Sequence, residues 1–151
     1  MQIPIVKVVL QKTGYVEITG KYSHVYNIDN VREIFAKELG SNNVETVGLI
    51  CLDTDNKIVN YSNISIGNIA NVDGSIAQIL KVALLSNSSK IMVAHNHPSG
   101  ILNYTDDDIV MTKKIGMIAR FLNIELLDSI VVVPDGNMLS IREKIREMHN
   151  E

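Results

Sequence analysis

Two histidines, His95 and His97, stand two residues apart where a short apolar segment, residues 91–94, runs into polar residues. Side chains at positions i and i+2 of an extended backbone point the same way, so both imidazoles can converge on one point. Asp108 follows eleven residues after His97, at the third position of a predicted helix. Two imidazole nitrogens and one carboxylate oxygen, with a fourth position left to water, make a catalytic rather than a structural zinc site.

The face of the predicted helix on which Asp108 lies supports this hypothesis. Helical spacing places Asp108 at the head of an apolar stripe that we expect to face the core. The other members of the stripe are Met111, Ile115, Ile118 and Leu122. A carboxylate at the head of a buried stripe needs a partner, and a cation is the obvious one.

Glu45 is the one charged residue in the apolar segment 44–52, VETVGLICL, which is typical of a strand buried on both faces. Its position has the same parity as Val47 and Leu49. An acid at the start of such a strand either lies in water at the rim of the sheet or has a role in catalysis. Beside a metal, Glu45 would take a proton from bound water and pass it to a leaving group.

Each of these residues also fits an ordinary structural role when it is taken alone. A His-x-His pair in a loop is often a turn with solvated imidazoles, Asp108 suits the N-terminal end of a helix dipole, and Glu45 suits a sheet rim. The conjunction of the four residues at the edges of buried elements favours the metal site. We interpret His24 and His149 as solvated, and Cys51 as a small core residue.

Length and composition restrict the other functions open to the chain. Its 151 residues predict one compact domain, and an apolar content of 46% excludes a largely disordered chain. A net charge of −3 argues against a chain whose main role is to neutralise nucleic-acid phosphates. One cysteine excludes an internal disulfide and multi-cysteine zinc sites. Without a signal peptide or an apolar run of about 18 residues, we expect a cytoplasmic protein with no membrane segment.

The elements that must position these residues follow from apolar periodicity and turn signals. Strands are predicted at 6–11 and 15–19, as a hairpin turning at Gly14, and at 44–52, 58–66, 91–94 and 124–133. Helices are predicted from an Asn30 cap to a stop at Gly40, from 73–75 onward, from a Thr105 cap to about 122, and over 141–148. Strands and helices interleave, which predicts an α/β fold with a mixed β-sheet layered with helices.

The arrangement of these residues resembles the JAMM (MPN+) metalloprotease motif, in which a Glu on an early strand precedes His-x-His, then ten residues that begin with Pro, and then Asp. Residues 94–100, AHNHPSG, match the signature of the RadC-like branch of bacterial JAB domains without a mismatch. Two further features are similar to this RadC-like branch: the spacing from Glu45 to Leu52-Asp53, and the run Lys81-x-Ala83-Leu84. The resemblance extends over about residues 30–142.

The resemblance implies the cytidine-deaminase-like α/β/α layering of JAMM domains. It implies that His95, His97 and Asp108 are zinc ligands and that Glu45 is the general acid/base. Thr105 stands where the family has a Ser whose hydroxyl helps to hold the oxyanion, and Tyr104 replaces the usual Pro. The first forty residues lack a Gly-rich hairpin, so we expect a single domain over 1–151 without an N-terminal helix-hairpin-helix module.

The function implied is zinc-dependent hydrolysis of an amide, in a peptide or isopeptide bond. The alternative is a non-catalytic or DNA-repair-associated domain that binds metal and interacts with other proteins. A nuclease fits less well, because one zinc with histidine ligands and no basic groove is a poor phosphodiester site. We therefore expect a peptide or protein substrate and no strong direct contact with nucleic acid.

Overall fold

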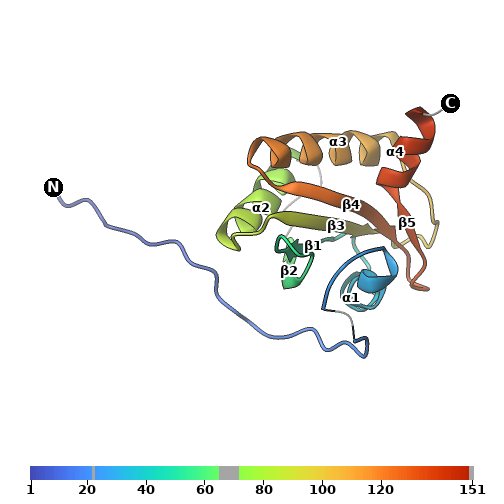
Figure 1. The fold of residues 1–151 in the computed structure, drawn as a ribbon, viewed down its shortest axis with the longest axis horizontal. Coiled ribbons are helices and arrows are strands. Elements are labelled where there is room, and N and C mark those ends of the chain that lie inside the picture. The colour runs from blue at the N-terminus through green and yellow to red at the C-terminus, as the bar shows by residue number, and fades with distance from the viewer. Residues whose placement is uncertain (22, 65–71, 150–151) are drawn as a thin grey trace.

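The computed structural model describes residues 1–21, 23–64 and 72–149, and five strands in these residues form one mixed sheet (Figure 1). The strand order across the sheet is β2-β1-β3-β4-β5. β3 and β4 run parallel, whereas the other neighbouring pairs are antiparallel. The strands are β1 (Val47–Leu52), β2 (Ile58–Ile64), β3 (Lys90–Asn96), β4 (Glu125–Val132) and β5 (Met138–Ser140).

Helices cover both faces of this sheet, which confirms the predicted α/β class (Figure 1). One core cluster joins the sheet to α2 and α3, and a second joins the opposite face to α1. The last helix, α4, contacts β4 and α3. The bounds are α1 (Asp29–Leu39), α2 (Val72–Leu85), α3 (Asp106–Phe121) and α4 (Ile141–His149). In the described residues, no helix is long and apolar enough to cross a membrane.

The apolar segment 44–52 forms β1 only from Val47 onward, and all six strand residues are buried. Alternate side chains enter opposite clusters: Leu49 packs toward α2 and α3, and Ile50 packs toward α1. This confirms a strand buried on both faces. Glu45 lies two residues before the strand begins, at one end of the sheet.

Gly48 allows β2 and α1 to pack closely against β1. A Cβ added at Gly48 would lie 2.7 Å from the Tyr61 hydroxyl oxygen and 3.1 Å from Leu39 Cδ1. We expect Gly48→Ala to lower the free energy of unfolding by about 1–3 kcal/mol, because overpacking forces neighbours out of their rotamers. Urea unfolding of both proteins measures this difference. An unchanged midpoint would show that Tyr61 moves aside without cost.

The predicted N-terminal hairpin is wrong. Residues 1–20 form neither helix nor strand. The N-terminal part of this segment runs away from the domain along an extended path (Figure 1), whereas Val16 and Ile18 pack against the core cluster that includes α1. β-Branched residues are compatible with a strand, but an isolated hairpin is marginal in water without a sheet to join. The end of the segment contacts α1 instead, since the Thr19 and Gly20 amides donate hydrogen bonds to the Glu33 carboxylate at 2.6 Å and 3.0 Å.

Most of the other predicted elements are present, with local differences. Asn30 lies inside the first turn of α1 rather than capping it, and its side chain accepts hydrogen bonds from the amides of Tyr26 and Asn27. Gly40 ends that helix, as predicted. The last two residues of the predicted strand 58–66 lie outside the described residues. The short strand β5 was not predicted.

The buried face of α3 differs from the predicted stripe at its C-terminal end. Ile118 and Leu122 are 37% and 39% exposed, whereas Thr112 and Ala119 are buried. The predicted spacing has a period of 3.5 residues, and a straight helix drifts by about 20° per heptad from such a pattern. The stripe therefore faces the core near Asp108 and turns outward further along.

Candidate metal centre

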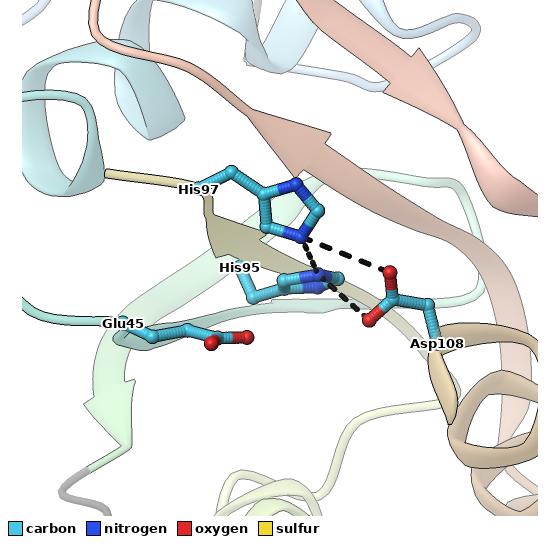
Figure 2. Close-up of side chains that lie close together, drawn as sticks. All are labelled: Glu45, His95, His97 and Asp108. Carbon is cyan, nitrogen blue, oxygen red and sulfur yellow. Dashed lines mark hydrogen bonds and ion pairs between the residues drawn. The ribbon is translucent and has the colours of Figure 1, made fainter. Parts of the chain in front are cut away.

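His95, His97 and Asp108 converge at the C-terminal end of β3 (Figure 2). The two Nε2 atoms lie 3.1 Å apart. His95 Nε2 is 3.0 Å from Asp108 Oδ1, and His97 Nε2 is 3.7 Å from Asp108 Oδ2. His95 lies within the strand and His97 directly after it, so the extended backbone directs both rings to the same side, as predicted.

Glu45 completes the cluster from the segment just before β1, the strand next to β3. The register pairs Val47 of β1 with His95 of β3, which brings the residues just before β1 to this end of β3. One ligand atom from each of Glu45, His95, His97 and Asp108 lies within 4.8 Å of the others. Figure 2 shows the Glu45 carboxylate facing the same space, without a hydrogen bond or ion pair to the other three.

Asp108 is held by the start of α3. Thr105 is the N-cap, and its Oγ1 accepts a hydrogen bond from the Asp108 amide at 3.2 Å. In return, Asp108 Oδ2 accepts from the Thr105 amide at 2.8 Å, which completes a capping box. The cap thus fixes the carboxylate that faces His95, and the predicted capping role of Thr105 is confirmed. The oxyanion role of Thr105 stays a prediction.

The protonation state of Asp108 suits a ligand. Partial burial by itself would raise the pKa of this carboxyl, but the hydrogen bond and charge of His95 and the hydrogen bonds from Thr105 outweigh burial. Together they lower the pKa of Asp108 to about 2. The group is therefore an anion throughout the physiological pH range, as a metal ligand must be.

The donor set and its spacing fit a zinc ion. Two imidazole nitrogens bound at about 2.0–2.1 Å to one tetrahedral zinc lie roughly 3.3 Å from each other. The observed separation of 3.1 Å between His95 Nε2 and His97 Nε2 is close to that value. Three protein ligands leave a fourth position open, which is the pattern of catalytic zinc sites.

A small cavity lies beneath the cluster, lined by His95, Asp108, Thr112 and Ser129 among others. Thr112 Oγ1 is buried and has no hydrogen-bond partner among the described residues. A buried hydroxyl without a hydrogen-bond partner costs free energy, so such a group is unusual in a protein core. Sequence reasoning missed Thr112, although a polar residue one helical turn after Asp108 was a usable signal.

The other residues considered from the sequence lie apart from the cluster. Cys51 is buried in the core, and burial raises the pKa of its thiol, which supports its interpretation as a core residue. His24 stacks on Tyr26 and forms an isolated bridge with Lys57. His149 is exposed at the end of α4, as predicted.

The family model described as the RadC-like JAB domain matches residues 25–147. The chain belongs to the RadC-like JAB domain family. The match includes Glu45, His95, His97, Thr105 and Asp108. The family resemblance inferred from the sequence is thereby confirmed.

Curated relatives of this RadC-like JAB domain are named UPF0758 proteins. The chain is 36% identical to that of Finegoldia magna over 115 residues, which are 76% of this chain and 51% of the relative. It is 35% identical to that of Roseiflexus castenholzii over 100 residues, which are 66% of this chain and 42% of the relative. It is 37% identical to that of Streptococcus uberis over 107 residues, 71% of this chain and 47% of the relative. The chain thus spans about half the length of the curated relatives that it matches.

Proposed function

We propose that this RadC-like JAB domain is a zinc-dependent hydrolase of amide bonds in peptides or isopeptides. The observation that carries the proposal is the convergence of two imidazoles and two carboxylates at one end of the sheet, within 4.8 Å of one another. His95, His97 and Asp108 would hold the zinc. Glu45 is then the one acid of the cluster left free for proton transfer.

A bound zinc ion would supply a water whose pKa is lowered to about 7 and a positive charge beside the substrate carbonyl. The Glu45 carboxylate would accept a proton from this water while the water oxygen bonds to the carbonyl carbon. The same carboxyl then gives the proton to the leaving amine nitrogen as the carbon–nitrogen bond breaks. A carboxylate oxygen of Glu45 lies within 4.8 Å of a ligand atom of each of the other three residues, so a water held among them would be close to this carboxylate.

The Thr105 hydroxyl supplies a further donor in this proposal. Thr105 Oγ1 accepts a hydrogen bond from the Asp108 amide, so its own hydrogen remains free to donate. Directed at the substrate, that hydrogen would stabilise the negative charge that develops on the carbonyl oxygen. Thr105 is exposed at the start of α3, beside the ligand Asp108.

A screen with two classes of amide tests the proposal. Zinc-loaded protein is incubated with internally quenched peptides and with peptides joined through a lysine ε-amino group, and products are identified by mass spectrometry. We expect cleavage of one class that stops when zinc is chelated and returns when zinc is restored. No cleavage of either class by protein with one zinc per chain would contradict the proposal and favour a non-catalytic interaction domain.

Direct binding of nucleic acid is expected to be weak. The chain has a net charge of −3, and phosphate-binding domains depend on an excess of Lys and Arg. We expect no retarded complex with a DNA duplex in an electrophoretic mobility assay at about 0.15 M salt. A complex that survives this salt concentration would contradict the expectation and support the DNA-repair alternative.

A further inference from the structure

Asn96, the residue between the two histidines, is fully buried, and its side chain bonds to one short segment, residues 42–46. Its Oδ1 accepts a hydrogen bond from the Thr46 amide at 2.6 Å. Its Nδ2 donates to the carbonyl oxygens of Asn42 and Val44, each at 3.1 Å. Both donors and the acceptor of the amide are therefore used.

The segment 42–46 belongs to no helix or strand of the described chain, so its backbone polar groups depend on other partners. Pairing between β1 and β3 begins only at Val47 and His95. Before Val47, three hydrogen bonds of the Asn96 side chain join the segment 42–46 to the end of β3. The Asn96 backbone amide adds a fourth to the Thr46 carbonyl, at 3.3 Å. One side chain thus fixes the segment against the end of β3.

Glu45 lies inside this segment, between two residues that Asn96 holds. Successive side chains of an extended strand point to opposite sides, so Asn96 faces away from the imidazoles of His95 and His97. The Glu45 carboxylate makes no hydrogen bond or ion pair to the other members of the cluster (Figure 2). Its place beside them is therefore set by the backbone on either side of it.

We propose that Asn96 is the positioning residue of Glu45. The inference rests on the proposed function of Glu45 in proton transfer, and it assigns to Asn96 an action through Glu45 and not through the metal ligands. A displacement of about 1 Å in a reacting group can cost on the order of 100-fold in rate. Loss of the three side-chain hydrogen bonds allows a displacement of this size.

The kinetic test uses Asn96→Ser, whose hydroxyl is too short to reach the segment. We expect one zinc per chain to be retained and the initial rate on an internally quenched peptide library to fall about 10- to 100-fold. In a Glu45→Gln background, Asn96→Ser should cause no further loss, because its effect passes through the Glu45 carboxylate. Asn96→Asp keeps the size of the side chain and removes at least one of the two donors that face the Asn42 and Val44 carbonyls. It is measured in the same way if the Ser variant does not fold.

The structural test needs no activity. Hydrogen exchange of the Thr46 amide should be slow in the wild type and at least tenfold faster in Asn96→Ser, whereas the Leu49 amide within β1 stays protected. The matched control is Asn60→Ala. Asn60 also donates a side-chain hydrogen bond within the domain, to Ser86 Oγ at 2.9 Å, but it lies on β2. We expect the control to leave Thr46 exchange and the rate unchanged.

The outcomes separate this inference from the proposed function. An inactive wild type with faster Thr46 exchange in Asn96→Ser would contradict amide hydrolysis and still support the hold of Asn96 on the Glu45 segment. Unchanged Thr46 exchange, loss of zinc in either Asn96 variant, or a further loss of rate in the Glu45→Gln background would overturn the positioning role.

Discussion

Glu45→Gln is expected to leave only a small residual rate of amide cleavage while the protein keeps one zinc per chain. The amide is nearly the same size as the carboxylate, but it cannot accept the proton of the attacking water. Loss of a general base costs about 10²- to 10⁴-fold in rate. Steady-state rates of zinc-loaded wild type and variant on the cleaved amide measure the loss, and elemental mass spectrometry measures the metal.

A matched control for this change is Glu125→Gln. Glu125 is exposed and begins β4, which runs parallel to β3, so it lies at the end of the sheet opposite His95. The control should retain the wild-type rate. Full activity of Glu45→Gln would contradict the assignment of proton transfer to Glu45, and loss of zinc in that variant would identify Glu45 as a ligand instead.

His97→Ala is expected to remove the stabilisation that zinc gives to the folded protein. A ligand that binds only the folded state at about 1,000 times its dissociation constant contributes roughly 4 kcal/mol. For a chain of this size, that free energy corresponds to a rise in Tm on the order of 10 °C. Thermal unfolding with and without zinc should show this rise in the wild type and little or none in His97→Ala.

His149→Ala provides the matched control, because His149 is exposed near the end of the chain and lies on α4, outside the four-residue cluster. Its response to zinc should equal that of the wild type. An equal rise in Tm for His97→Ala and wild type would show that zinc binds elsewhere, and the assignment of His97 as a ligand would then be wrong.

The parts of the site that sequence predicted depend on short-range geometry. The convergence of His95 and His97 follows from the two-residue period of a strand, and the placement of Asp108 follows from the cap that begins α3. The burial of β1 follows from its nearly uniform apolar composition. Each of these signals lies within a few residues of the side chain that it positions.

The parts that sequence did not predict depend on partners that are distant along the chain. The β-branched residues near the N-terminus favour a strand, but no neighbouring strand accepts them in the described structure. The bonds from Asn96 to Asn42 and Val44 span more than 50 residues, and no local pattern indicates which loop such an amide will hold. A polar side chain in a buried strand signalled only that some partner must exist.

The most direct test of the proposed metal site is the metal content of untagged protein purified without chelator, determined by elemental mass spectrometry. We expect one zinc per chain, held by His95, His97 and Asp108. No bound metal in folded protein, even after zinc is supplied, would contradict this expectation. The four clustered residues would then be a non-catalytic feature of an interaction domain.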